Sequence, residues 1–208
     1  MQRNLAFVFI VFLVMISGCG EGQVQIPTPP PAPQDKIIFM GDHENNNDIF
    51  MASTDGTDLT NLTKSSHDDV LFAWSPDGRQ ILLVTDRDGN SEVYVMHADG
   101  AYPHNLSTHA ADDGFPRWSP DGQSIAFSSQ RDGNAEIYLV RLSDGGLTNL
   151  TNDPGEDVFP SWSPDGQKIV FTSLRDENAD IYVMLSDGSS LQRLTDHPGN
   201  EWNPLWVP

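Results

Sequence analysis

Three observations predict an all-β fold, a β-propeller of four four-stranded blades. First, four tryptophans recur at a constant spacing of 44 residues: Trp74, Trp118, Trp162 and Trp206. Second, three other series keep the same step: Ile37, Ile81, Ile125 and Ile169; Phe50, Tyr94, Tyr138 and Tyr182; Leu62, Leu106, Leu150 and Leu194. Third, 17 glycines and 15 prolines favour many turns and short strands. A fixed period in the low forties is typical of propeller blades built from four strands.

Each repeat is predicted to contain four short strands, called A to D in chain order. In the third repeat, strand A covers 115–118, strand B 124–129 and strand C 136–140, and a short strand D ends at Leu150. Ser119-Pro120-Asp121-Gly122 forms the turn between A and B, because proline presets φ and glycine accepts a positive φ. Strands B and C are apolar on both faces, as in sheets stacked between neighbours. The tryptophans are expected to fill the space between adjacent blades.

The two ends of the repeat region predict how the ring closes. It begins with a B strand at 36–40 and ends with an A strand at 204–208. The terminal A strand is therefore expected to pair with the N-terminal B strand and complete the shared blade, which removes the sheet edges of an open array. A homodimer that closes an eight-bladed ring is the alternative. The complete set of strands favours the four-bladed monomer.

The N-terminal segment is predicted to direct export and lipid anchoring. Arg3 precedes the apolar run 5–16, which suits a signal peptide and is shorter than the roughly 20 residues needed to span a bilayer. Ser17-Gly18-Cys19 follows and resembles the lipobox of bacterial lipoproteins, although Ile16 is less usual there than leucine. The resemblance implies lipidation at Cys19 after removal of 1–18. An uncleaved membrane anchor is the alternative.

The predicted organisation is therefore a signal peptide at 1–18, a lipidated cysteine with a linker at 19–35, and the propeller at 36–208. The proline-rich stretch 26–33 favours extended polyproline II and is interpreted as a semi-rigid spacer. Because residue 20 is glycine and not aspartate, the chain resembles lipoproteins sent to the outer membrane, facing the periplasm, if the host is Gram-negative.

Charge and cysteine content exclude several classes of function. The formal net charge is -19, with 30 acidic and 11 basic residues, so nucleic acid is not an expected partner. An envelope protein or a polysaccharide remains open. The single cysteine excludes an internal disulfide and a four-cysteine zinc site, and the six histidines show no zinc-ligand spacing.

The repeats also resemble a known family. The sequence Trp-Ser-Pro-Asp-Gly begins at residues 74, 118 and 162, and is similar to the element of TolB-like, WD40-like (PD40) propeller repeats; 131–138 matches the same pattern. The resemblance covers about 36–208. It implies a periplasmic or exported propeller that serves as an interaction platform. Function depends on sites grafted on the fold, so the partners of TolB itself do not carry over.

No catalytic machinery is evident, and the chain is predicted not to be an enzyme. There is no Gly-x-Ser-x-Gly elbow, and the hydrolase domain of propeller-containing peptidases has no counterpart. The alternative is a peptidase- or polysaccharide-related hydrolase or lyase with a site on the B–C and D–A loops. Two stretches, 41–48 and 200–203, depart from the repeat, and are attributed to the terminal position of their blade.

The acidic residues of the B–C and D–A loops are the candidate site, since these loops share one face of the disc. Each D–A loop ends in an acid predicted to lie near the channel mouth and to contact a basic or cation-bridged partner: Asp69, Asp113, Asp157 and Glu201. Each B–C loop carries an acid-x-Asn-x-acid pattern, whose oxygens suit Ca²⁺: Glu44, Asn46 and Asp48; Asp88, Asn90 and Glu92; Asp132, Asn134 and Glu136; Asp176, Asn178 and Asp180. The alternative is that these side chains cap loop amides and pair with Arg87, Arg131 and Arg175.

Overall fold

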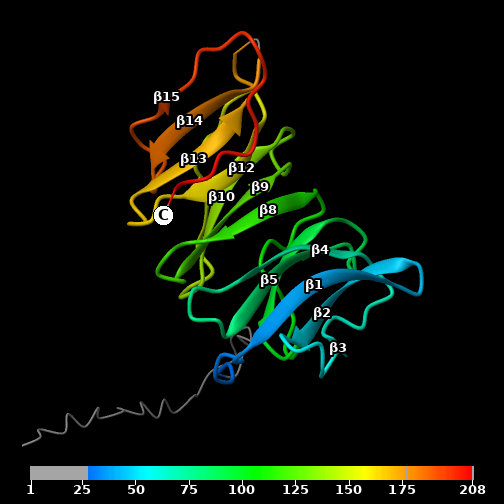
Figure 1. Cartoon of the computed structure of the whole chain (residues 1–208). Coiled ribbons are helices and arrows are strands. Elements are labelled where there is room, and N and C mark those ends of the chain that lie inside the picture. Colours follow the sequence, from blue (N-terminus) through cyan, green and yellow to red (C-terminus); the bar gives the residue numbers. More distant parts are fainter. Residues whose placement is uncertain (1–27, 177, 208) are drawn as a thin grey trace, which may run out of the picture.

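The computed structural model describes residues 28–176 and 178–207, and these form four consecutive antiparallel sheets without a helix (Figure 1). The signal peptide, Cys19 and the first part of the linker lie outside the described residues. No helix in the described residues has the length and apolar character needed to cross a membrane. The all-β propeller architecture predicted from the 44-residue period is confirmed.

The sheets follow the predicted order of strands A to D. The first has three strands, β1 (Lys36–His43), β2 (Asn46–Ser53) and β3 (Thr60–Asn61). The second contains β4 (Asp69–Trp74), β5 (Gln80–Thr85), β6 (Glu92–His97) and β7 (His104–Asn105). The third contains β8 (Asp113–Trp118), β9 (Ser124–Ser129), β10 (Glu136–Arg141) and β11 (Leu147–Asn149). The fourth contains β12 (Asp157–Trp162), β13 (Lys168–Ser173), β14 (Asp180–Leu185) and β15 (Gln192–Arg193).

The core lies between the sheets. Strands B and C are buried on both faces, as their apolar sequences require, and three apolar clusters each join two successive sheets. Ile125 and Phe127 of β9, for example, pack against Leu82 and Val84 of β5. Trp118 packs against the same cluster, and its indole Nε1 donates to the Ala73 carbonyl of the preceding sheet at 3.4 Å. The tryptophans therefore bridge neighbouring blades, although they are partly and not fully buried.

Each A strand contains a bulge at the same place. The A–B register shifts between Val70 and Ala73, Gly114 and Arg117, and Val158 and Ser161. The residues at the bulges have positive φ although none is glycine: Leu71 at 50°, Phe115 at 52° and Phe159 at 57°. A bulge turns a side chain away from the regular alternation of a strand.

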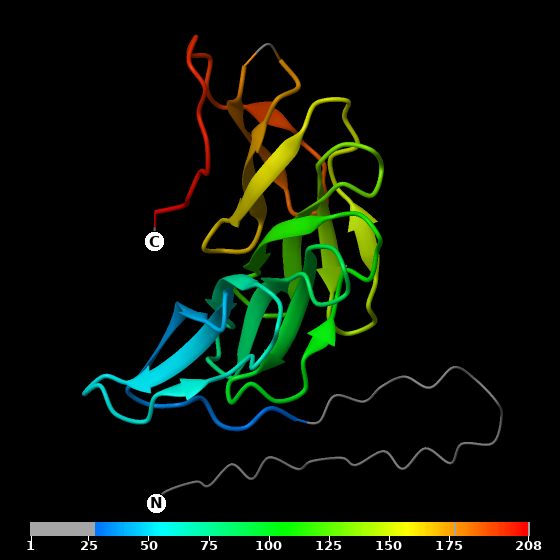
Figure 2. The same ribbon diagram turned by 90° about the vertical axis from the view of Figure 1, so that its right-hand side faces the viewer.

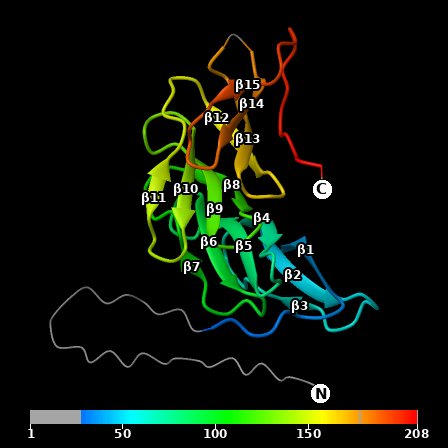
Figure 3. The same ribbon diagram turned by 90° about the vertical axis from the view of Figure 1, so that its left-hand side faces the viewer.

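The sheets form an open arc, with the first and the last at opposite ends (Figures 1 and 3). Within the described residues, β1 pairs only with β2, and 201–207 form no strand. This segment runs beside the fourth sheet (Figure 2). The expected pairing of the C-terminal A strand with the N-terminal B strand is thus not seen within one chain.

Candidate functional site

The blades present two different ends. The Ser-Pro-Asp-Gly turns and the C–D turns lie at one end, here called the turn end, and the B–C and D–A loops lie at the other, here called the loop end. Residues before β1 approach the turn end, because a Cβ placed at Gly78 of the first A–B turn would lie 3.1 Å from the Ala32 side chain. Thr28 and Pro29 line a groove of about 730 Å³ between the second and third sheets, together with turn residues such as Asp144. The loop end is left uncovered by this segment.

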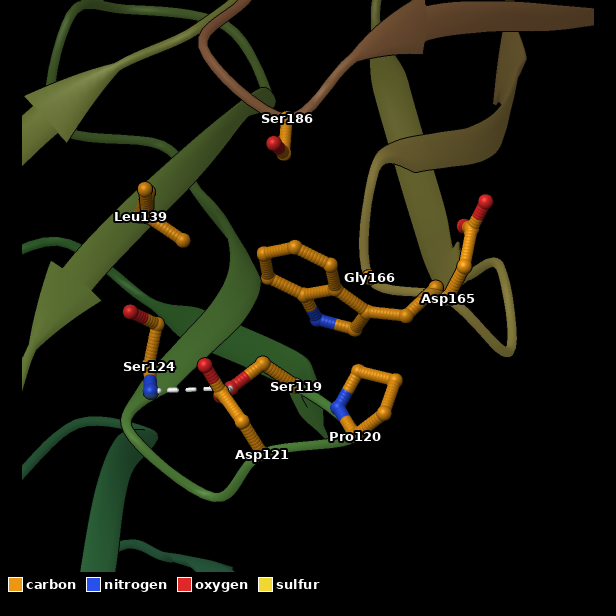
Figure 4. A pocket seen from close by; sticks show the side chains of 9 residues that line it. Ser119, Pro120, Asp121, Ser124, Leu139, Asp165, Gly166 and Ser186 are labelled. Carbon is orange, nitrogen blue, oxygen red and sulfur yellow. Dashed lines mark hydrogen bonds between the residues drawn. The ribbon is translucent and has the colours of Figure 1, made fainter.

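A hollow of about 460 Å³ at the turn end, between the third and fourth sheets, contains serine and aspartate side chains (Figure 4). Ser119 Oγ donates to Asp121 at 2.5 Å and accepts from the Ser124 amide at 2.9 Å, as the dashed line in Figure 4 shows. No histidine is among the residues that line it. Ser75 and Ser163 make the same bonds in their turns, so the serine closes a repeated turn and is not an activated nucleophile.

Three of the four acids predicted to meet a partner are buried in ion pairs. Asp69, Asp113 and Asp157 are 0%, 2% and 0% exposed. Their carboxylates pair with the B–C loop arginines of the same sheet: Arg87 at 2.9 Å, Arg131 at 3.3 Å and Arg175 at 2.9 Å. Burial raises the pKa of Asp157 even though Arg175 acts in the opposite direction. A partner at the loop end therefore cannot reach these three carboxylates, because their own arginines and the A strands cover them.

The arginines belong to a recurring network. Each guanidinium lies over the ring of a C-strand tyrosine, 4.9 Å from Tyr94, 4.6 Å from Tyr138 and 4.7 Å from Tyr182. Each tyrosine hydroxyl donates to the exposed acid that follows the arginine, namely Asp88, Asp132 or Asp176. Burial, and then this bond, raise the pKa of each tyrosine to about 12. The same hydroxyl bond lowers the pKa of Asp88 and Asp132.

The acid-x-Asn-x-acid triplets brace the loops. The amide of Asn90 donates to the carbonyls of His109 and Ala111 at 3.0 Å, and Asn134 does the same to Asp153 and Gly155 at 2.8 and 3.1 Å. Glu92 accepts from the Ser107 hydroxyl and the His109 amide, while Asp88 faces Tyr94. The oxygens of one triplet thus point to different partners. The described residues contain no group of three or more His, Cys, Asp or Glu side chains arranged to hold a metal ion.

The first repeat departs from this pattern, as the sequence of 41–48 suggested. Glu44 and Asn45 both have positive φ, 50° and 73°, and form a two-residue hairpin turn between β1 and β2. His43 stands where the arginines stand in the other repeats. Its ring lies edge-on to Phe50 at 6.3 Å, as the arginines lie over the tyrosines, and its Nδ1 is 3.3 Å from Asp48.

An apolar ladder near the loop end was not found by sequence reasoning. The A strands of successive sheets contact one another, and their bulges carry Leu71, Phe115 and Phe159. The Phe115 and Phe159 rings are 4.2 Å apart, and Trp202 meets Phe159 edge-on at 6.2 Å. Leu71, Phe115 and Val158 line a hollow of about 240 Å³ that opens between the second and third sheets beside Asp112. The 44-residue step of Leu71, Phe115 and Phe159 was the available signal.

Exposed acids border this ladder. Asp68, Asp112 and Glu156 precede the three buried aspartates in the D–A loops and are exposed. One oxygen of Asp112 accepts from the Ser91 amide at 3.0 Å, and Asp68 accepts from Asn47 in the same way at 2.8 Å. The other oxygens remain available on the surface. The arrangement can bind an apolar side chain flanked by positive charge.

Comparison with known proteins agrees with this fold. The family model of the TolB beta propeller domain matches residues 106–208. No curated protein matches the chain. The structure of putative TolB from Agrobacterium tumefaciens is similar with a TM-score of 0.67 and 25% identity, over 81% of this chain and 66% of that one.

Other solved structures share the fold at lower identity. TolB from Acinetobacter baumannii aligns with a TM-score of 0.73 and 22% identity, over 86% of this chain and 45% of that one. A puromycin-hydrolysing peptidase from Mycobacterium tuberculosis aligns with a TM-score of 0.64 and 14% identity, over 79% of this chain and 28% of that one. The chain spans less than two thirds of each of these proteins. The same blades therefore occur in proteins of different activity.

Proposed function

From the premise that this chain is built of TolB-like propeller repeats, we propose that it is a protein-binding module of a bacterial cell envelope, held at a membrane by a lipid on Cys19. The observation that carries the proposal is the apolar ladder within a border of exposed acids at the loop end. Binding is favoured over catalysis because the repeated polar side chains already serve as ion pairs, turn closures and loop braces.

The chemistry of the ladder defines the partner. Leu71 is 44% exposed at the edge of the hollow, and an exposed apolar side chain beside a cavity favours a contact site. Asp68, Asp112 and Glu156 would attract lysine or arginine to the same rim. We therefore infer a partner protein with a segment that places an apolar side chain between basic residues. The apolar ladder and the exposed acids beside it thus take the place of Asp69, Asp113 and Asp157 as the proposed contact residues, because the carboxylates of those three aspartates are buried.

The direction of the chain supports this assignment. Thr28, Pro29 and Ala32, which precede β1, lie at the turn end, and Ala32 lies close to Gly78 there. A tether that arrives at the turn end leaves the loop end facing away from its attachment point. The ladder would then be presented to partners across the envelope.

Capture of envelope proteins by the full chain in detergent tests the proposal. We expect Leu71→Asp to lower the captured amount of a specific partner at least tenfold. The matched control is Leu191→Asp, because Leu191 is also 44% exposed but lies near the C–D turn of the fourth sheet. Equal capture by the wild-type chain and both variants would show that the ladder is not the binding site.

A further inference from the structure

The two ends of the sheet array are complementary. Among the residues that the structure describes, the first sheet has no A strand of the kind that β4, β8 and β12 supply to the other three. The free edge of β1 therefore offers unpaired backbone groups, and Ile37 and Met40 on it are each 50% exposed. At the other end, Trp202 and Leu205 are 49% and 66% exposed. A missing strand at one end corresponds to a surplus segment at the other.

The C-terminal segment shares two backbone features with the A strands, although 201–207 form no strand within one chain. The Glu201 amide donates to the Ala179 carbonyl at 2.8 Å, as the Asp113 amide donates to Ser91 at 2.8 Å at the start of β8. Asn203 has a φ of 55°, close to the 57° of Phe159, the bulge residue one repeat earlier. The segment therefore begins and bulges in phase with β4, β8 and β12, and its outer edge has no B strand beside it.

Two buried polar atoms in this segment have no hydrogen-bond partner: Glu201 Oε2 and Trp206 Nε1. The equivalent acids pair with Arg87, Arg131 and Arg175, and the repeat places His43 at the same position in the first sheet. Glutamate is longer than aspartate, and histidine is shorter than arginine, so the pair spans a comparable distance. His43 and Glu201 thus occupy the two positions of this pair and are complementary in length; the other oxygen of Glu201, Oε1, lies 3.8 Å from His197.

We propose that two copies of the chain associate head to tail, and that residues 201–206 of each copy add the missing A strand to β1 of the other. The two sheets to be joined lie at opposite ends of the arc (Figures 1 and 3), which favours a second copy over pairing within one chain. Two identical junctions related by a two-fold axis close one ring of eight blades. Closure by a partner removes both exposed edges at once.

The repeat fixes the register of the junction. In the fourth sheet, Val158 pairs with Thr172, and Ser161 pairs with Val170 across the bulge. In the next repeat, the A-strand positions of Val158 and Ser161 are held by Trp202 and Leu205. In the first sheet, the B-strand positions of Thr172 and Val170 are held by Met40 and Ile38. The register of the fourth sheet therefore sets Trp202 opposite Met40 and Leu205 opposite Ile38. The same step sets Glu201 opposite Gly41 and Trp206 opposite Ile37. The exposed side chains of Ile37, Met40, Trp202 and Leu205 thereby each gain a neighbour across the junction.

Thiol cross-linking of full-length chains in detergent tests both the register and the second copy. Chains with Met40→Cys and chains with Trp202→Cys, marked by different tags, are expressed together and treated with a short bifunctional thiol reagent. We expect a covalent dimer that carries both tags. The wild-type chain, whose only cysteine is Cys19, and the pair Met40→Cys with Leu191→Cys are the controls, and neither should give this product.

A chain with both Met40→Cys and Trp202→Cys distinguishes closure within one copy. Cross-linking of this chain as a monomer, or a polypeptide mass equal to that of one processed chain for the wild type, would overturn the proposal. We expect the polypeptide mass of two processed chains for the wild type and for Leu191→Asp. Leu205→Asp should raise the dimer dissociation constant at least tenfold. An unchanged dissociation constant for Leu205→Asp would equally contradict the junction.

Discussion

At the residue scale, the acidic side chains of the loops are of two kinds: some are buried in ion pairs, and others are exposed. Asp157 is buried on Arg175, while its neighbour Glu156 is exposed. The sequence contains both as adjacent acids in a loop and does not distinguish them. Pairing with Arg87, Arg131 and Arg175 was the alternative that the sequence left open, and the ion pairs agree with it for the three buried aspartates. The fixed offset of 18 residues from each of these aspartates to its arginine favours the pairing, because the antiparallel A and B strands bring these positions together.

This distinction predicts different costs for two adjacent neutralisations. Asp157→Asn removes the nearest counter-charge of Arg175 and leaves it only the carboxylate of Asp153 at 3.8 Å, so it should lower the free energy of unfolding by about 3 kcal/mol. Glu156→Gln should change it by less than about 0.5 kcal/mol. Urea denaturation of the two variants measures both values. Similar losses would mean that Asp157 is not paired as described.

The tyrosines predict an alkaline limit of stability. Their pKa is raised to about 12 in the fold from 10.0, so folding favours the protonated hydroxyl. The resulting contribution is fully present below pH 10 and is lost as the pH rises through about 12. Unfolding followed against pH should therefore show a steep loss of stability in that interval. Tyr138→Phe should make the loss less steep, and an unchanged slope would argue against the network.

At the scale of the element, the strands and tight turns were predictable, and the bulges were not. Strand B of the third repeat was expected at 124–129, and β9 occupies Ser124–Ser129, because a Pro-Asp-Gly turn and an apolar run both act locally. Phe115 was expected in a regular strand, yet it has positive φ. Local propensity disfavours this conformation for a bulky residue, so only packing between blades explains it. The 44-residue step of Leu71, Phe115 and Phe159 was visible in the sequence, but the bulges that align them into the apolar ladder were not.

Packing between blades predicts the cost of removing a repeat tryptophan. Trp118→Ala removes contacts with the second sheet and the hydrogen bond to Ala73, and should cost about 3 kcal/mol. Tyr102→Ala, at an exposed aromatic, is the control and should cost less than about 1 kcal/mol. Thermal and urea denaturation compare the two. A small loss for Trp118→Ala would place its indole outside the interblade core.

The loop triplets predict insensitivity to calcium. The amides of Asn90 and Asn134 hold backbone carbonyls, and the carboxylates of Glu92 and Glu136 accept from hydroxyl and amide donors. Adding Ca²⁺, or removing it with a chelator, should leave the melting temperature unchanged. A rise that saturates with Ca²⁺ would show that the triplets rearrange into a metal site.

At the scale of the whole molecule, the period alone predicted the repeated sheets, whereas closure depended on geometry that no single repeat contains. The sequence of 204–208 predicts an A strand, but the described part of it, 204–207, forms no strand within one chain, because local chemistry does not specify its partner strand. The choice between one copy and two follows from the curvature accumulated over four sheets. That quantity is set by every interblade contact together.

Anchoring is a prediction at this same scale. Cys19→Ser should abolish incorporation of labelled palmitate and leave an unprocessed precursor, because the cysteine is the expected acceptor of the lipid. Labelling of cells that express the wild-type chain or the variant makes the comparison. Equal labelling of both would refute the assignment.

The three apolar clusters have a consequence for how the molecule opens and refolds. Each cluster belongs to two sheets, so the second and third sheets have a neighbour on both sides, whereas the first and fourth have one. In an isolated chain, amide hydrogens of β9 should exchange most slowly and those of β1 fastest, because opening proceeds inward from the ends of a one-dimensional array. In a closed ring every sheet has two neighbours, and this gradient should flatten. The profile of amide exchange rates along the chain therefore distinguishes an open array of four sheets from a closed ring.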